Sequence, residues 1–308
     1  MITAEEWAQL ERHGGIIDLS RSVKLRLSGP DALRYLNGQV TNDVRRLGKD
    51  VESMPACLCN HKGKLEAFVI ISRDTAGAFY ITADEALREF LPLRLEKYLI
   101  ADDAKLEDLS DAFDLVHAWG EAAASRSSCQ TGSPGAFAAN RLRSRGIDIW
   151  FPASEAPDMH FVSTKTLETL RIDRGIPAWV PELSQGILPP EARLDADAID
   201  YYKGCYTGQE VISRIRSVGK VNRLLVSLAA KDGRKLEAGW ELCSTNESGA
   251  SVSVGSITSA AWHPALQTGI ALGFVKRSAA DGELLAGPPD AGPSATVEIR
   301  KTLDDSQP

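Results

Sequence analysis

The octapeptide at residues 203–210, Lys-Gly-Cys-Tyr-Thr-Gly-Gln-Glu, constrains this chain more than any other segment. Thr207 and Glu210 have the spacing of a capping box, in which each side chain bonds to a backbone N–H that the first helical turn leaves unpaired. Apolar residues at helical spacing follow. We therefore predict a helix with Thr207 at its N-cap, and Cys205 two residues before that cap.

The position of Cys205 gives it two possible roles. It lies between Gly204 and Gly208, near the positive end of the expected helix, where the dipole favours the reactive thiolate. Lys203 would add positive charge if its side chain folded toward the sulfur. The alternative is a small residue packed in a tight turn. The surrounding motif favours a functional thiol.

The other cysteines indicate neither a disulfide framework nor a metal site. The chain has 5 cysteines, an odd number spread over 308 residues. Cys57 and Cys59 would share one face of a strand, but a lone C-x-C pair is a weak zinc signal, so we predict packed-core roles for both. Cys129 falls in a segment that reads as a surface loop. The histidines are widely separated, and no metal site is predicted.

Composition limits the class of protein. Hydrophobic residues make up 43% and charged residues 25%, as in soluble globular proteins, and no apolar run reaches the length of a membrane span. The N-terminus is acidic and lacks a secretory pattern, so we expect a cytoplasmic protein without membrane contact. The net charge of −7 argues against a broad nucleic-acid surface.

One local run departs from this acidic balance. Arg214, Arg216, Lys220 and Arg223 follow the octapeptide with no acidic residue between them. Such a run is either a solvated face or a site for carboxylate groups.

Hydrophobic patterns predict an α+β region at residues 1–219 and a small β-barrel or sandwich at 220–308. In the first region, apolar runs flank a glycine turn at residues 60–64 and predict a hairpin. Beyond residue 220 the segments are short, β-rich and punctuated by glycine. The predicted strands are 24–27, 54–59, 65–72, 78–82, 113–119 and 147–151, then 224–228, 240–243, 252–258, 270–275 and 295–299. One predicted helix is opened by residues 28–31, and two others span residues 87–99 and 164–174.

The octapeptide resembles the signature of the YgfZ-type folate-binding proteins, relatives of the glycine-cleavage T-protein, an aminomethyltransferase. Residues 27–44, 60–64, 170–177 and 188–192 resemble further blocks of that family, in the same order. The resemblance implies a T-protein-like fold, with mixed α/β N-terminal lobes around a central folate channel and a C-terminal β-barrel.

The resemblance also implies a cofactor, tetrahydrofolate, and residues that would bind it. Asp173 matches an acidic residue associated with the pterin ring, and Arg223 matches an arginine that we assign to the glutamate tail. Gln209 and Tyr206 complete the implied folate contacts, and Cys205 is the implied functional thiol. Lys203, Gly204, Gly208 and Glu210 are the remaining motif positions.

The implied role is an accessory protein that supports iron–sulfur cluster assembly or repair, and through it tRNA modification. Its partners would be folate and iron–sulfur assembly factors or client enzymes, with no direct contact to nucleic acid. The main alternative is a tetrahydrofolate-dependent aminomethyltransferase or other one-carbon transferase. That branch has paired aspartates after the hairpin turn, where this chain has Glu66 and Ala67. A third possibility is an interaction module with a vestigial channel.

Overall fold

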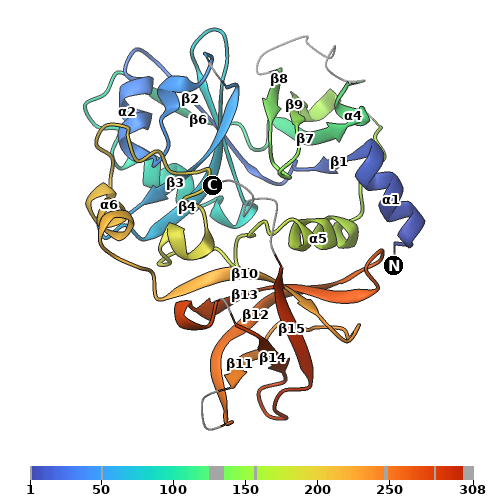
Figure 1. The fold of residues 1–308 in the computed structure, drawn as a ribbon. Coiled ribbons are helices and arrows are strands. Elements are labelled where there is room, and N and C mark those ends of the chain that lie inside the picture. The colour runs from blue at the N-terminus through green and yellow to red at the C-terminus, as the bar shows by residue number, and fades with distance from the viewer. Residues whose placement is uncertain are drawn as a thin grey trace.

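The computed structural model describes residues 2–49, 51–124, 135–155, 158–245, 249–280 and 282–300. The chain forms a five-stranded sheet, a four-stranded sheet and a closed barrel. The two sheets lie side by side, and the barrel lies across one end of both (Figure 1). The predicted α+β class with a C-terminal barrel is confirmed. Cys129 lies outside the described residues.

The five-stranded sheet has the order β3-β4-β5-β2-β6. The expected hairpin is confirmed, since β3 and β4 are antiparallel and joined by the turn at residues 60–64. Alternate residues of β4 are buried against α2 and α3, as its apolar alternation predicts. The strands are β2 (Val23–Ser28), β3 (Ser53–Cys59), β4 (Leu65–Arg73), β5 (Phe79–Ala83) and β6 (Lys105–Asp108), and the helices are α2 (Ala32–Gln39) and α3 (Phe90–Glu96).

The four-stranded sheet has the order β1-β7-β9-β8, and the chain enters it through a helix that we did not predict. That helix, α1, begins with a true capping box between Thr3 and Glu6. Arg141 links the two sheets by donating to Asp148 and to the Thr82 hydroxyl. The elements are α1 (Ala4–His13), β1 (Gly14–Asp18), β7 (Phe113–Gly120), α4 (Glu121–Ala124), β8 (Ala136–Ala139), β9 (Gly146–Pro152) and α5 (Thr164–Asp173).

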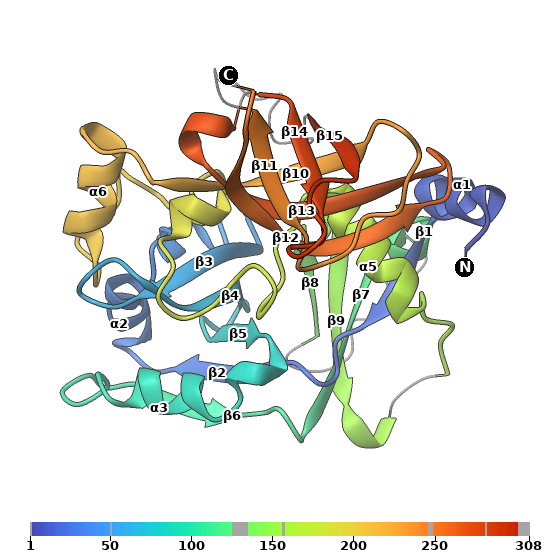
Figure 2. The same cartoon turned by 90° about the horizontal axis from the view of Figure 1, so that it is seen from below.

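The barrel closes in the order β10-β13-β12-β11-β14-β15. Five of these strands were predicted; β14 was missed because its four residues give too short a pattern. Figure 2 shows helix α5 beside the barrel strand β12, with which it is in contact. The division at residue 220 stays a prediction. The strands are β10 (Arg223–Ala230), β11 (Glu241–Thr245), β12 (Ser251–His263), β13 (Thr268–Lys276), β14 (Leu284–Gly287) and β15 (Ala295–Arg300).

Short helices complete the chain: η1 (Val44–Arg46), η2 (Glu85–Leu87), η3 (Ala153–Glu155), η4 (Pro189–Ala192), η5 (Arg277–Ala279) and α6 (Gln209–Ser217). Among the helices in the described part of the chain, none is long and apolar enough to cross a membrane.

A buried polar network joins α5 to the barrel. The Glu182 side chain, wholly buried, accepts hydrogen bonds from Arg171 at 2.8 Å, Thr258 at 2.7 Å and Ser259 at 2.6 Å. Arg171 also donates to the Ser259 hydroxyl at 2.7 Å. Glu182 lies in the long connection between α5 and α6, so this segment is anchored at its centre and positions the octapeptide that follows.

Replacing Glu182 with alanine should therefore be strongly destabilising. The variant removes the buried carboxylate of this ion pair, and breaking a buried pair typically costs about 3–5 kcal/mol. Glu168 also pairs with Arg171, but its side chain is 45% exposed, so Glu168→Ala should cost under about 1 kcal/mol. Urea unfolding monitored by circular dichroism measures both. Equal losses in the two variants would show that Glu182 is not the anchor.

Candidate functional site

The octapeptide is tied to the N-terminal part of the chain by Lys203. Its side chain is buried, with the residue only 5% exposed. The ammonium nitrogen donates to the backbone carbonyls of Asn37, Val40 and Asn42, each at 2.7 Å. Helix α2 ends at Gln39, so Lys203 satisfies the Asn37 carbonyl of its last turn, which lacks a partner within the helix, together with the carbonyls of Val40 and Asn42 just beyond it. We call this arrangement the Lys203 clamp.

The clamp holds a charge away from solvent. Burial lowers the pKa of Lys203 to about 7, while the carboxylates of Asp43 and Asp200 act in the opposite direction. The side chain is thus committed to backbone carbonyls. The condition under which Lys203 would add positive charge at the Cys205 sulfur is therefore not met, because its ammonium donates to three backbone carbonyls.

Two glycines bring the hairpin turn against the octapeptide. Gly208 has φ 86°, and a Cβ at this position would lie 2.5 Å from the Asn60 carbonyl oxygen. Gly63 has φ 68°, and a Cβ there would lie 3.0 Å from Cβ of Val211. The Thr207 amide also donates to the Gly38 carbonyl at 3.2 Å. The hairpin turn, the end of α2 and the octapeptide therefore form one packed unit.

This packing overturns the predicted capping box. Helix α6 begins at Gln209, its N-cap is Gly208 in the left-handed conformation, and no side chain caps it. Gly208 combines this conformation with close contact to the Asn60 carbonyl, both of which favour glycine, and the helix starts past Thr207. Glu210 is consequently an exposed residue of the first turn.

Cys205 and Tyr206 face opposite environments. Cys205 is an exposed free thiol. Tyr206 is buried, with its ring centre 5.2 Å from the Lys203 nitrogen. Burial raises the pKa of Tyr206, and its hydroxyl has no hydrogen-bond partner among the described residues. A buried hydroxyl without a partner is costly, which makes it a candidate contact for a bound polar ligand.

The other two cysteines of this region pack beneath the motif. Cys57 and Cys59 are both fully buried, in one hydrophobic cluster with Tyr206. Burial raises the pKa of Cys59 to about 12. Their predicted packed-core role is confirmed. In the residues that the structure describes, no cluster of three or more His, Cys, Asp or Glu side chains could hold a metal ion.

Asp173, at the end of α5, and Arg223, the first residue of barrel strand β10, each have a protein partner. The Asp173 carboxylate is 2.8 Å from the Arg300 guanidinium and 3.4 Å from the His263 ring. Burial opposes ionisation of Asp173, but these two neighbours keep its pKa below the usual value. Arg223 donates to Glu191 at 3.1 Å and lies 4.6 Å from the centre of the Phe274 ring.

The contacts thus separate the predicted site residues into two groups. Lys203, Tyr206 and Gly208 belong to the packed unit around the hairpin turn, and Gln209 is half-buried at the start of α6. Among the described residues, no hydrogen bond or ion pair joins Asp173 or Arg223 to that unit. Gly204 is exposed, with open space where a Cβ would lie.

Glu66 lies in the segment where the resemblance to the transferase branch predicts paired aspartates. The register of β3 and β4 shifts between the Leu58/Ala67 and Cys59/Leu65 pairs, so Glu66 has no opposite residue. Its carboxylate accepts from Arg94, whose guanidinium also donates to the Gln39 side chain at 3.0 Å and the Cys59 carbonyl at 3.2 Å. Sequence patterns did not identify Arg94 as a partner of Glu66.

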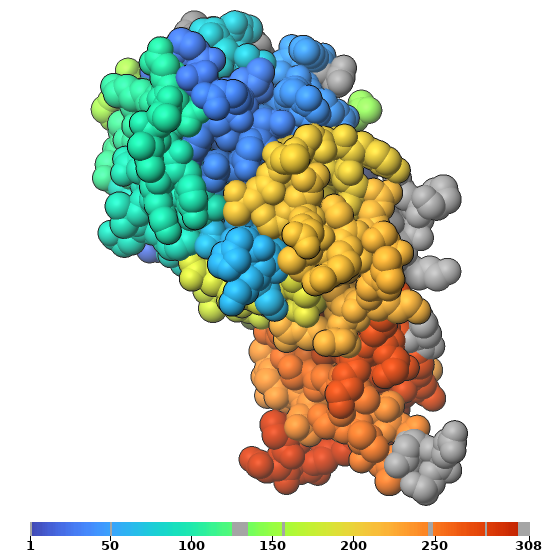
Figure 3. Space-filling view, turned by 90° about the vertical axis from the view of Figure 1, so that its left-hand side faces the viewer, coloured from blue at the N-terminus to red at the C-terminus, as the bar shows by residue number. Residues whose placement is uncertain are grey.

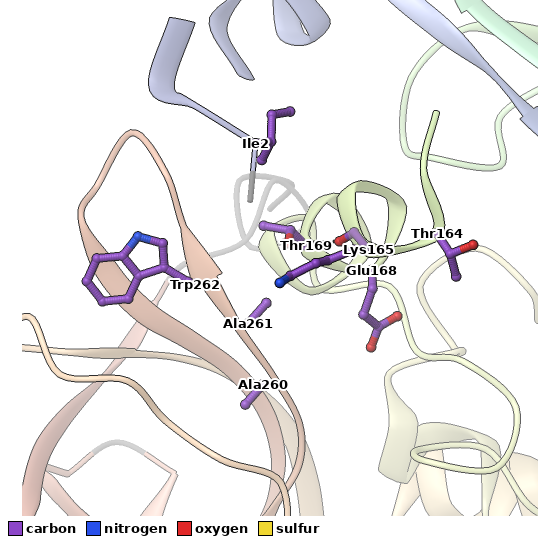
Figure 4. Close-up of a pocket in the computed structure, with 8 residues that line it drawn as sticks. All are labelled: Ile2, Thr164, Lys165, Glu168, Thr169, Ala260, Ala261 and Trp262. Carbon is purple, nitrogen blue, oxygen red and sulfur yellow. Dashed lines mark hydrogen bonds between the residues drawn. The ribbon is translucent and has the colours of Figure 1, made fainter. Parts of the chain in front are cut away.

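Two cavities lie away from these residues. One, of about 430 Å³, is bounded by Ile2, helix α5 and strand β12, and the Lys165 side chain extends from α5 toward β12 (Figure 4). The other, of about 750 Å³, includes Ser20, Asp84 and Val180 in its lining. Neither is lined by a predicted site residue. The central channel stays a prediction.

The two glycines of the octapeptide should respond differently to substitution. Gly208→Ala places a Cβ in the left-handed conformation and against the Asn60 carbonyl, so we expect a loss of about 2 kcal/mol or more in the free energy of unfolding. Gly204→Ala, in open space and outside that conformation, should change it by less than about 1 kcal/mol. Thermal and urea unfolding compare the pair. A tolerated Gly208→Ala would contradict the close approach of the hairpin turn.

Comparison with known proteins gives the same relationships. Residues 1–128 match the model of the GCVT N-terminal domain. The tRNA-modifying protein YgfZ of Klebsiella pneumoniae is 28% identical over 239 residues, covering 70% of this chain and 72% of the relative. The tRNA-modifying protein YgfZ of an Enterobacter species is 28% identical over 252 residues, covering 74% and 75%.

Among solved structures, the glycine cleavage system aminomethyltransferase T from Bartonella henselae superposes with a TM-score of 0.79, covering 94% of this chain and 86% of that one. At 18% identity, this likeness concerns the fold alone. The resemblance predicted from the sequence motifs is confirmed: this chain is similar in sequence to the YgfZ-type proteins and has the fold of the glycine-cleavage T-protein.

Proposed function

We propose that this protein is a cytoplasmic tetrahydrofolate-binding accessory protein with Cys205 as its functional thiol. It supports iron–sulfur cluster assembly or repair, and through it tRNA modification, together with assembly factors or client enzymes. The observation that carries the proposal is the fixed, exposed setting of Cys205. The residues near it are anchored, Lys203 by three carbonyls and Tyr206 by burial, while the thiol itself is exposed.

We assign folate binding to the α+β region at residues 1–219. The β-barrel domain at residues 220–308 would border the bound folate. Tetrahydrofolate carries one-carbon groups on its ring nitrogens and has an anionic glutamate tail. The unpartnered hydroxyl of Tyr206 supplies a hydrogen-bonding group of the right kind, and Gln209 lies three residues from it. Asp173 would accept from pterin N–H groups. Arg223, whose side chain is 46% exposed, would exchange Glu191 for a tail carboxylate.

The alternative, an aminomethyltransferase, is supported by the shared fold. The local chemistry argues against it. A transferase needs a carboxylate free to direct proton movement beside the folate. Glu66, at that position, is held by the Arg94 guanidinium, which is itself buried. We therefore favour the accessory role.

Cys205→Ser tests this proposal directly. The substitution removes no large apolar group from an exposed position, so the fold and tetrahydrofolate binding should persist. In a deletion strain the variant should fail to restore the activity of iron–sulfur enzymes, whereas Gly204→Ala should restore it. Isothermal calorimetry with tetrahydrofolate and complementation measure the two properties separately.

Three results would count against the proposal. Full complementation by Cys205→Ser would leave the thiol a packing residue. The absence of heat and of a thermal shift with millimolar tetrahydrofolate would remove the folate assignment. Methylene-tetrahydrofolate formation from an aminomethylated lipoyl carrier, at about 1 per second or faster, would favour the transferase.

A further inference from the structure

The surface beside the exposed thiol combines positive charge with exposed apolar groups. It consists of Tyr202, Arg214, Arg216, Val218 and Lys220, and we call it the α6 patch. Tyr202 and Val218 are each 87% exposed. The three basic side chains are exposed, and none has an ion-pair partner in the described ranges. Figure 3 shows residues of this part of the chain, in gold, between the five-stranded sheet and the barrel.

Arg216 orders the aromatic part of the α6 patch. Its guanidinium carbon lies 4.2 Å from the centre of the Tyr201 ring and 5.1 Å from that of Tyr202. The guanidinium also donates to the Tyr202 hydroxyl at 3.2 Å. An exposed tyrosine held in place by an arginine loses little conformational entropy on binding, and both residue types dominate the energetics of protein interfaces.

The α6 patch adjoins Cys205 through the chain. Tyr202 precedes Cys205 by three residues, a span of at most about 11 Å. Between them, Lys203 is fixed by the clamp. A segment docked on the α6 patch would therefore present its own groups near the thiol.

The charge of the α6 patch indicates an acidic partner. The chain as a whole carries −7, so this local positive field contrasts with its surroundings. Glu210 lies one turn before Arg214 but forms no ion pair with it among the described contacts. Nucleic-acid surfaces commonly neutralise about 6–10 phosphates, more than these side chains supply. A short acidic stretch of polypeptide matches them better.

We infer that the α6 patch docks an acidic polypeptide segment of the protein whose sulfur chemistry Cys205 serves. The inference rests on the proposed function in taking Cys205 as the functional thiol. It adds the class of partner and the surface that selects it.

Thiol–disulfide exchange with synthetic peptides tests this selection. Each peptide carries one cysteine as a mixed disulfide with thionitrobenzoate, flanked by glutamates, glutamines or lysines. The Cys205 thiolate attacks the peptide sulfur, a new disulfide joins the two, and thionitrobenzoate leaves as a thiolate that absorbs visible light. Cys205→Ser measures the background from other cysteines.

The acidic peptide should react about tenfold or more faster than the neutral one at low salt, and the lysine peptide more slowly still. High salt should remove the difference. Arg214→Glu with Lys220→Glu should reverse the preference. The matched control is Lys235→Glu with Arg277→Glu, two exposed cations of the barrel region, and it should leave the preference unchanged.

The outcomes separate this inference from the proposed function. Equal rates for acidic and neutral peptides at low salt, with Cys205 reacting, would overturn the docking surface alone. No Cys205-dependent reaction with any peptide would refute an accessible functional thiol. If a single-stranded RNA, or a triglutamate form of tetrahydrofolate, competed more strongly than an unlabelled acidic peptide, the α6 patch would belong to that ligand and the inference would be wrong.

Discussion

The buried ammonium of Lys203 is the interaction on which the arrangement of this site depends. A buried charge is unfavourable unless polar groups surround it, and three carbonyls at the end of α2 meet that need at 2.7 Å each. The same contacts give a helix end its missing donors. Segments separated by more than 150 residues are thereby joined. The position of Cys205 follows from this, because its loop is anchored by the clamp before it and by buried Tyr206 after it.

The acidic and basic residues expected to contact folate also hold parts of the fold together. Asp173 joins the end of α5 to Arg300 on the last barrel strand, and Arg223 joins the first barrel strand to Glu191. Glu66, which is not among the expected folate contacts, likewise joins the hairpin to α3 through Arg94. A ligand at these residues would have to share or replace internal partners. Ligand binding and the contacts between lobes and barrel are for this reason expected to be coupled.

Much of the fold, but less of the site, could be predicted from the sequence. The hairpin and most barrel strands follow from local alternation and turn residues, and the motif blocks led to the T-protein-like fold. The capping box failed because Gly208 is the N-cap instead, in the left-handed conformation and in close contact with the Asn60 carbonyl, in a segment almost 150 residues away. The acceptors of Lys203 are backbone carbonyls, which leave no mark on side-chain patterns. Arg94 was missed as the partner of Glu66, and Arg300 as the partner of Asp173, because each lies far from its partner along the chain.

The central claim, that the Lys203 clamp joins the end of α2 to the cysteine loop, is tested most directly by amide hydrogen exchange in Lys203→Met. Methionine keeps the apolar stem but leaves three buried carbonyls without a donor. Exchange should accelerate by about tenfold or more in residues 37–43 and 199–208 together, while the barrel strands keep their wild-type protection. Unchanged exchange at residues 37–43 would contradict the account, since the end of α2 would then not depend on Lys203.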